Sequence, residues 1–333
     1  MGSAGASPYP DSPAERDRWI LARRTQTHRR NNLDPRRPHA CFLEYEPDET
    51  GRVRSCATVF LTNRECPWRC LMCDLWQQTL TESVPAGAIP AQIEFGFGKV
   101  GPAEQVKLYN SGSFFDPRAI PPEDHPAIAR LVANFSRVVV ECHPSLVNDS
   151  AVRFRDQLGG KLEVAIGLET AHPPTLEKLN KRMTLELFAR AAEFLRRHGI
   201  SLRVFLLVQP PFLPDEAEAL DWTRRSVEFS FDCGATVVSL IPTRAGNGAL
   251  DVLARDGHFV PPQLATLEAA LVQGLKSGRG RGRVFADLWD LPSLSSCRAC
   301  FRMRSRRLER MNLQQEIEHD VTCAVCSGAH SGA

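Results

Sequence analysis

The stretch ATVFLTNRECPWRCLMC, residues 57–73, joins a short apolar run to a loop that holds three cysteines. The run 57–62 is uncharged and rich in β-branched residues, which is typical of a strand buried on both faces. Cys66, Cys70 and Cys73 follow within eight residues, with no histidine between them. A buried strand that ends in a cluster of thiols indicates a sheet whose edge carries a metal or cofactor site.

Five further apolar runs follow, separated by turns and by stretches with helical periodicity. They span residues 105–110, 137–142, 162–169, 202–209 and 236–241. Thr184 and Gly199 would cap the two ends of one intervening helix, since Thr is favoured at helix starts and Gly just past helix ends. Repeated strand–helix alternation predicts a parallel sheet. Six units favour a curved, open barrel, a partial (β/α)6 fold of the α/β class, over a complete eight-fold barrel.

Length and composition predict one large domain with extensions. Of 333 residues, 43% are hydrophobic and 24% charged, and the formal net charge is +2. This composition excludes a disordered chain, and the small net charge does not decide whether nucleic acid is a partner. We expect a basic, partly disordered arm over residues 1–40, the (β/α)6 core over 41–250, and an extension with a disordered tail over 251–333.

Cysteine usage indicates the compartment. Eleven cysteines, seven of them in tight clusters, favour metal ligation under reducing conditions over a disulfide scaffold. No stretch approaches the roughly 20 apolar residues of a membrane helix, and the N-terminal residues lack the apolar core of an export signal. The sequence therefore predicts a cytoplasmic protein with no membrane partner.

The first cysteine cluster has an unfilled ligand position. Three thiolates from one short loop can hold three irons of a [4Fe–4S] cube and leave the fourth iron open. A structural zinc ion requires a fourth ligand, and the loop contains none. The alternative is a zinc ion that borrows a distant ligand such as Cys56 or His143.

The spacing C-x3-C-x2-C in CPWRCLMC, placed after the first strand of a six-unit barrel, resembles the radical S-adenosylmethionine (SAM) superfamily. In that superfamily SAM binds the open iron, and one electron from the cluster cleaves SAM to a 5′-deoxyadenosyl radical. The resemblance implies a [4Fe–4S] cluster, SAM and an electron donor such as flavodoxin or ferredoxin. Cys66, Cys70 and Cys73 would then be both metal ligands and catalytic residues.

The resemblance also implies which polar residues contact SAM. The segment after the second strand usually meets the SAM amino group, and here it consists of Asn110, Ser111, Gly112 and Ser113. Gly112 would allow the ligand to approach the main chain closely. Met72, within the cysteine loop, belongs to the same expected set of cofactor contacts.

Three charged residues complete the expected SAM site. Glu169, at the end of the fourth strand, resembles the residue that holds the ribose or methionine portion; alternatively it caps a helix. Lys181 and Arg182 are placed to pair with the SAM carboxylate, or they face solvent at a helix start. Glu141 and His143 also end a strand, and we expect them to order loops.

Several longer segments resemble one family within the superfamily, the radical SAM subunit of archaeosine synthesis. They include SGSFFDPRAIP (111–121), VAIGLETAHPPTLEKLNKRMT (164–184) and VSLIPTRAGNG (238–248), and the resemblance covers about residues 40–270. That family acts on tRNA carrying a lysine-modified 7-deazaguanine, cleaves a carbon–nitrogen bond of the lysine, and works with a partner transferase. The resemblance therefore implies a lyase in tRNA modification.

Two departures from that family bear on the substrate. The cysteine loop is more compact than in archaeal members, and a Trp-rich continuation after residue 248 is absent. Both departures suit a bacterial-type member with a different substrate. The alternatives are a small-molecule or a peptide substrate.

A second cysteine set lies near the C-terminus, where Cys297 and Cys300 are separated by 22 residues from Cys323 and Cys326. Four thiolates in two CxxC pairs can enclose one tetrahedral zinc ion with every position filled. The alternative ligand is an auxiliary iron–sulfur cluster.

Arginine-rich segments favour RNA as a partner, because such segments bind phosphates without reading sequence. One of these segments is the basic, glycine-rich turn at 276–283. The other arginines that we assign to phosphate binding are Arg23, Arg24, Arg29, Arg30, Arg36, Arg37, Arg302, Arg304, Arg306, Arg307 and Arg310. A hypothesis of another class remains: a non-catalytic zinc protein that binds RNA.

Overall fold

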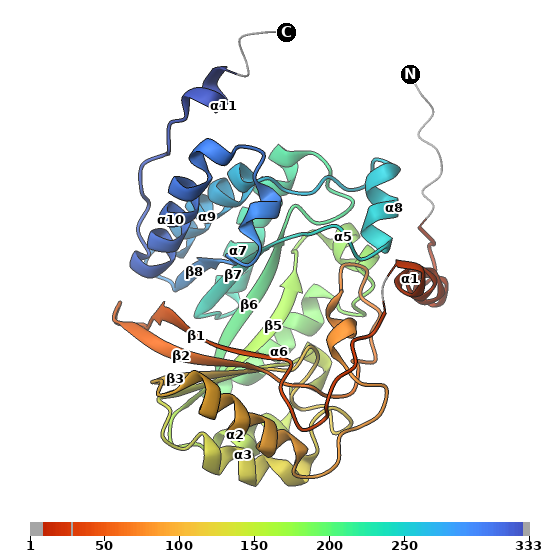
Figure 1. Ribbon diagram of the computed structural model, residues 1–333, viewed down its shortest axis with the longest axis vertical. Coiled ribbons are helices and arrows are strands. Elements are labelled where there is room, and N and C mark those ends of the chain that lie inside the picture. Colours follow the sequence, from red (N-terminus) through yellow and green to blue (C-terminus); the bar gives the residue numbers. More distant parts are fainter. Residues whose placement is uncertain (1–8, 28, 329–333) are drawn as a thin grey trace.

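The computed structural model describes residues 9–27 and 29–328, in which eight strands form one curled sheet in chain order (Figure 1). The first strand is antiparallel to the second, and all later neighbours are parallel. The strands are β1 (Ala40–Pro47), β2 (Val53–Phe60), β3 (Gln105–Tyr109), β4 (Arg137–Glu141), β5 (Lys161–Glu169), β6 (Ser201–Val208), β7 (Val237–Pro242) and β8 (Arg283–Ala286). The expected disorder of the first residues and of the tail falls on residues 1–8 and 329–333, outside the described residues.

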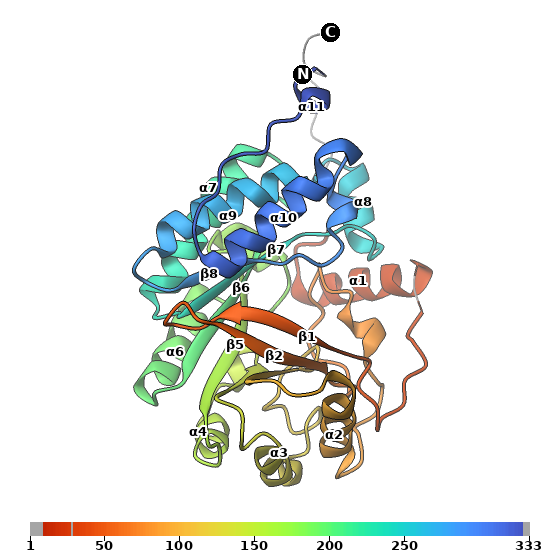
Figure 2. The same ribbon diagram turned by 60° about the vertical axis from the view of Figure 1, so that its left-hand side comes forward.

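Helices follow most of the parallel strands and cover the outer face of the sheet (Figures 1 and 2). They are α1 (Pro13–Thr27), α2 (Ala88–Val100), α3 (His125–Leu131), α4 (Asp149–Arg155), α5 (Pro173–Lys178), α6 (Leu185–Arg197), α7 (Glu216–Asp232), α8 (Ala249–Arg255), α9 (Leu264–Gly278), α10 (Arg298–Gln314) and α11 (Ala324–Gly328). Among the described residues, no helix combines the length and the apolar character needed to cross a membrane.

The predicted α/β open barrel is confirmed. The six apolar runs coincide with β2 to β7, and their alternate side chains join one hydrophobic core with the covering helices. Thr184 caps α6 as expected, since its hydroxyl accepts a hydrogen bond from the Leu187 N–H at 3.2 Å. Gly199 follows the helix with a φ of +64°, a conformation that costs glycine little.

Two strands were missed, so the sheet has seven parallel strands rather than six. β1 carries Glu44 and Glu46 at alternate positions, and the apolar-run criterion overlooks a strand with charges facing inward. β8 has only four residues and begins at Arg283, the last residue of the basic stretch 276–283. The first three residues of that stretch belong to α9, which ends at Gly278. Both strands lie at the edges of the sheet.

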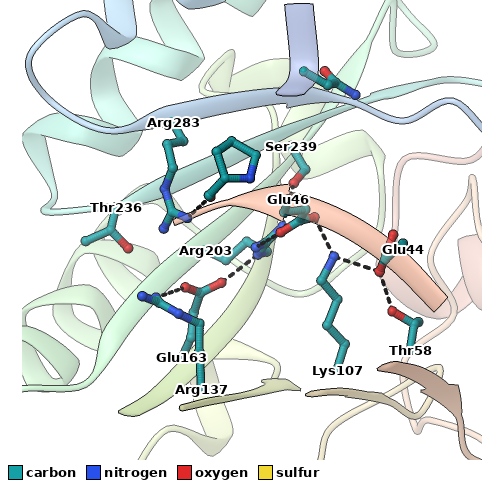
Figure 3. Close-up of polar contacts among 12 residues, drawn as sticks. Glu44, Glu46, Thr58, Lys107, Arg137, Glu163, Arg203, Thr236, Ser239 and Arg283 are labelled. Atoms are coloured by element: carbon teal, nitrogen blue, oxygen red, sulfur yellow. Dashed lines mark hydrogen bonds and ion pairs between the residues drawn. The ribbon is translucent and has the colours of Figure 1, made fainter. Parts of the chain in front are cut away.

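A buried network of ion pairs fills the barrel near the amino ends of the parallel strands (Figure 3). Glu163 on β5 is fully buried and binds Arg137 on β4 at 2.6 Å and Arg203 on β6 at 2.7 Å. Glu46 on β1 binds the same Arg203 at 2.7 Å and also pairs with Lys107 on β3. The network therefore joins the antiparallel first strand to strands on the far side of the curl.

The charges in this network stay ionised because they are paired. Burial alone would lower the pKa of Lys107, but the carboxylates of Glu46 and Glu44 reverse that effect and raise it well above its ordinary value. Burial alone would raise the pKa of Glu163, and the guanidinium groups of Arg203 and Arg137 instead hold it low. Each member thus depends on its partners, since an isolated buried charge is strongly unfavourable.

The C-terminal segment covers the free edge of β8. The Asn312 side chain donates to the Ala286 carbonyl and accepts from the Ala286 N–H, both at 2.8 Å. Gln315 pairs in the same way with Val284, at 3.0 and 2.8 Å. Two side-chain amides therefore satisfy the main-chain groups that an edge strand otherwise leaves unpaired.

We expect Glu163→Gln to destabilise the apo-protein by about 3 to 5 kcal/mol, because it leaves Arg137 and Arg203 buried without their shared carboxylate. Urea unfolding at pH 7 measures the change. Glu193→Gln is the matched control, because Glu193 pairs with two arginines on the exposed surface of α6 and its loss should leave stability unchanged. Equal effects of the two variants would contradict this role for the network.

Candidate functional site

The carboxyl ends of the parallel strands meet at one rim, and the cysteine loop lies there after β2. Burial raises the pKa of the Cys66 thiol to about 12 and also raises the pKa values of Cys70 and Cys73. Two of the thiols also respond to the charge of the others: Cys73 raises the pKa of Cys66, and both raise the pKa of Cys70. The three thiols are therefore neighbours that stay protonated until a metal replaces their protons.

The loop is not built for a single zinc ion. Among the described residues, the only set of three or more cysteines, histidines or acids gathered tightly enough for one ion is the C-terminal set, Cys297, Cys300, Cys323 and Cys326. The thiols of Cys66, Cys70 and Cys73 do not form such a set. In a cluster each thiolate binds a different iron, so the thiols need not converge on one ion.

Neither proposed distant ligand can complete a zinc site on the loop. Cys56 is buried beside Lys107 and Glu46, in the charged network near the amino ends of the strands. Both ring nitrogens of His143 are engaged: Nδ1 lies 2.8 Å from Ser145 Oγ, and Nε2 lies 3.0 Å from the Lys181 carbonyl oxygen. The alternative of a zinc ion with a borrowed ligand therefore lacks its fourth donor.

The N-terminal arm holds the cysteine loop in place. Arg24 is buried and binds Glu65 at 3.2 Å and the Cys70 carbonyl at 3.3 Å. Arg30 binds the other oxygen of Glu65 at 2.6 Å and the Trp76 carbonyl at 2.9 Å. The two arginines thus bracket the loop from Glu65 to Trp76.

An apolar cluster seals the same loop. Leu71, at its centre, is fully buried with Trp19 and Ile20 of α1 and with Leu250 of α8, and the Met72 side chain packs against this cluster. The Asn247 side-chain amide donates to the Leu71 carbonyl at 2.8 Å. The Met72 side chain, predicted to contact the cofactor, is thus partly buried against the apolar cluster between the arm and the barrel.

The predicted SAM-binding segment Asn110–Ser113 lies beside the cysteine loop. A Cβ at Gly112 would lie 3.6 Å from the Cys66 Cβ, so the two loops are in contact range. Asn110 is fully buried, yet neither polar atom of its side chain has a partner among the described residues. Such orphaned groups are rare in proteins unless a ligand satisfies them.

Glu141 orders this segment, as expected. Its carboxylate accepts a hydrogen bond from the Asn110 N–H at 2.8 Å. Burial raises the pKa of Glu141 to about 6, and the N–H groups of Asn110, Ser111 and Gly112 limit that rise. The carboxylate therefore holds the backbone of the candidate SAM segment in one conformation.

Lys181 points into the site and Arg182 points away from it. Lys181 Nζ donates to the Gly167 carbonyl at 2.6 Å and to Glu169 Oε1, and its charge acts on the Cys70 and Cys66 thiols. Arg182 instead binds Asp17 on α1 at 2.7 Å and the Pro13 carbonyl at 2.8 Å. The structure thus gathers Lys181 and Glu169 at the site, while Arg182 fastens the N-terminal arm.

A stacked pair joins the cysteine loop to the segment that follows β4. The Trp68 and His143 rings lie 3.7 Å apart with an interplanar angle of 14°. Ser113 Oγ accepts a hydrogen bond from the His143 N–H at 2.9 Å. His143 therefore contacts three parts of the site, namely the cysteine loop, the candidate SAM segment and the Lys181 carbonyl. The CPWRC sequence places Trp68 in the loop, but nothing in the sequence indicates its partner.

Backbone strain concentrates on this rim. Of eight non-glycine residues with positive φ among the described residues, six lie at the last position of β5 or in loops that follow β3, β5 and β6: Ser111, Glu169, Asn180, Arg182, Gln209 and Phe212. Conformations of this kind cluster where surrounding structure holds them for function. Asn180 shows how: its side-chain amide donates to the Arg69 carbonyl and to Asp17, both at 2.8 Å, and so ties the cysteine loop to α1.

Most of the arginines assigned to RNA are engaged inside the protein. Arg307 is buried and binds Glu268 and Asp320, Arg304 binds Glu268, and Arg310 binds Glu318. Arg24 and Arg30 hold the cysteine loop, Arg23 lies 3.5 Å from the Trp19 ring centre and Arg37 lies 4.1 Å from that of Phe95. By contrast, Arg302 and Arg306 are exposed and have no ion pair among the described residues, and Arg29 and Arg36 are also exposed.

Comparison with known proteins supports the resemblance found in the sequence. No protein-family model matches the chain. It is 28% identical over 229 residues to archaeosine synthase subunit beta from Methanosarcina acetivorans, a match that covers 65% of this chain and 66% of the subunit, just under two thirds. An uncharacterized protein from Methanocaldococcus jannaschii is 24% identical over 311 residues, covering 87% of this chain and 84% of the relative. The expected likeness to the archaeosine-synthesis family is confirmed.

Among solved structures, the chain superposes on the radical SAM methyltransferase TsrM from Kitasatospora setae with a TM-score of 0.45. The two chains are 18% identical, and the superposition covers 59% of this chain and 38% of the methyltransferase.

We expect acid to weaken the His143 anchor. Burial, together with the positive charge of Lys181, lowers the pKa of His143 to about 4 from 6.5. Between these values the unfolded chain binds a proton that the folded chain does not, so the stability contributed by His143 rises with pH across this window. Urea unfolding of the apo-protein should show that the wild type is more stable than His143→Gln at pH 7 and that this margin shrinks by about 2 to 3 kcal/mol at pH 4.5. A margin that is the same at both pH values would contradict the assignment.

Proposed function

We propose that the protein is a radical SAM enzyme that holds a [4Fe–4S] cluster on Cys66, Cys70 and Cys73 and binds SAM at the remaining iron. The observation that carries the proposal is a rim loop with three neighbouring thiols, for which neither Cys56 nor His143 is free to serve as a fourth ligand. Its resemblance to archaeosine synthase subunit beta supports the same assignment.

The residues around the loop fit an amino-acid ligand. The unsatisfied amide of Asn110 offers both a donor and an acceptor. Lys181 offers a positive charge beside the thiols, and Glu169 a carboxylate at the end of β5. A ligand that carries an ammonium, a carboxylate and a ribose has a complementary group for each of them.

When bound, the cluster and SAM supply one-electron cleavage of the sulfonium, which yields methionine and a 5′-deoxyadenosyl radical. The chain's own part is to position and protect the reacting groups. Arg24 and Arg30 fix the cysteine loop, Glu141 fixes the segment Asn110–Ser113, and the packing of α1 and α8 around Leu71 excludes water from one side.

We further propose that the substrate is a nucleoside in tRNA, with carbon–nitrogen cleavage of a lysine-modified 7-deazaguanine as the reaction. The support is the similarity to archaeosine synthase subunit beta. A second support is a basic face on α10, where Arg298, Arg302 and Arg306 recur every four residues, are all exposed and form no ion pair with any residue that the structure describes. The proposal includes a partner transferase, a flavodoxin or ferredoxin as electron donor, and a cytoplasmic location.

The competing hypothesis is a non-catalytic zinc protein that binds RNA, with both cysteine sets structural. It requires a closed four-ligand site at each set. The C-terminal set provides one, but the first set has only three thiols, and neither Cys56 nor His143 is free to complete it. This difference in ligand number favours the enzyme.

We expect Cys70→Ala to abolish SAM cleavage. The protein, reconstituted without oxygen with iron and sulfide and reduced with dithionite, should convert SAM to 5′-deoxyadenosine, which liquid chromatography with mass spectrometry quantifies. Removing one of three thiolates should lower both the iron bound at this loop and the product to background. Cys233→Ala is the control, since Cys233 lies at the end of α7, outside both cysteine sets. Full cleavage by Cys70→Ala would disprove the assignment.

We expect the basic face of α10 to contribute to tRNA affinity. Replacing Arg302 and Arg306 with glutamine removes two phosphate contacts, which should reduce the slope of log K against log salt by about two. Filter binding of tRNA between 50 and 200 mM salt, a range of about fourfold, measures the slope. Arg190→Gln on α6 is the control, because Arg190 is exposed on another surface. Equal slopes for all three proteins would show that this face does not bind RNA.

A further inference from the structure

The C-terminal cysteines have the spacing of a mononuclear site. Cys297 Sγ lies 3.9 Å from Cys323 Sγ, and Cys300 Sγ lies 3.7 Å from Cys326 Sγ. All four sulfurs lie within 4.8 Å of one another. Zinc–sulfur bonds of about 2.3 Å in a tetrahedron place the sulfurs about 3.8 Å apart. In an iron–sulfur cube each thiolate binds a different iron, so the sulfurs would lie farther apart.

The surroundings suit a charged tetrathiolate site. Cys297 caps the start of α10, where helix N–H groups favour negative charge. Arg304 lies one turn after Cys300, where its charge and that thiol act on each other, and it also binds Glu268 on α9. Four thiolates outnumber the two positive charges of zinc, and a neighbouring guanidinium offsets part of the excess.

The site closes a loop that covers the sheet edge. Between the two cysteine pairs, the chain runs along α10 and returns through residues 315–322. Arg307 fixes the returning segment, since it binds the Glu318 carbonyl and Asp320, each at 2.8 Å. Asn312, in the last turn of α10, and Gln315, directly after the helix, pair with the free edge of β8. Figure 2 shows α10 lying along α9 and reaching β8 at its far end.

We propose that Cys297, Cys300, Cys323 and Cys326 bind one structural zinc ion, which locks the returning segment 315–322 onto α10 and so keeps the edge of β8 covered. The ion has no open position and takes no part in catalysis. The site is independent of the chemistry at Cys66, Cys70 and Cys73, and the proposal stands whether or not the protein cleaves SAM.

The metal is identified in the full chain with Cys66, Cys70 and Cys73 all replaced by alanine, so that only the second set can bind. Inductively coupled plasma mass spectrometry should find about one zinc per chain and no iron or sulfide, even after anaerobic reconstitution with both. Cobalt(II) in its place should give the visible bands of a tetrahedral tetrathiolate. Adding Cys326→Ser should remove the ion, whereas adding Cys233→Ser should not. Iron and sulfide in this protein, or no metal at all, would overturn the proposal.

Hydrogen exchange tests the role of the ion without depending on activity. Removing zinc with a mercurial and a chelator, or by Cys326→Ser, should speed amide exchange at least tenfold in residues 315–322 and in β8. Exchange in β3 to β5, on the far side of the barrel, should not change. If zinc is bound but its removal leaves β8 and residues 315–322 as protected as before, the proposed locking role is wrong.

Discussion

The shared carboxylate of Glu163, held between Arg137 and Arg203, is the interaction on which the rest of the barrel depends. Three strands, β4, β5 and β6, contribute one charge each, and Glu46 extends the chain of pairs to β1 (Figure 3). Because none of these charges can be buried alone, the strands must keep one register for all of them to be paired. The amino-terminal half of the barrel is thereby filled with structural charge. The candidate site lies at the opposite ends of the same strands.

Arginines in both terminal segments bind other parts of the protein. Their basic sequences therefore cannot be interpreted as phosphate-binding surface alone. Arg24 and Arg30 bind the cysteine loop, and Arg304 and Arg307 bind Glu268 on α9. An arginine can satisfy several carbonyl and carboxylate oxygens at once, so it is well suited to joining irregular segments to a barrel. The number of arginines in the sequence is therefore larger than the number that is free to bind phosphates. Among the arginines that the structure describes, residues such as Arg302 and Arg306, which are exposed and form no ion pair, remain available.

The sequence allowed the parallel strands to be located because each carries an uninterrupted apolar run. It did not reveal β1, whose inward positions hold Glu44 and Glu46, since their partners Lys107 and Arg203 lie far away in the chain. The cysteine loop was predictable because its ligands are local. The contacts of Asn180 and His143 with that loop were not, because they depend on where separate strands end. Lys181 and Arg182 show what sequence alone cannot predict. They are adjacent in the chain, but Lys181 binds the Gly167 carbonyl at the site and Arg182 binds Asp17 on α1. Arg182 has a left-handed φ of +58°, which the sequence does not indicate.

The two cysteine sets differ in the property that separates reactive from structural metal sites. Cys66, Cys70 and Cys73 lie in a loop whose shape is imposed from outside by Arg24, Asn180 and His143. A loop held in this way can keep an incomplete ligand set, because its conformation does not depend on the metal. In the C-terminal set, Cys323 and Cys326 lie beyond the part of the returning segment that Arg307 and Arg310 hold, so the metal itself supplies the order there, and four ligands supply it best. Ligand number thus follows from how much of each loop the surrounding protein already fixes.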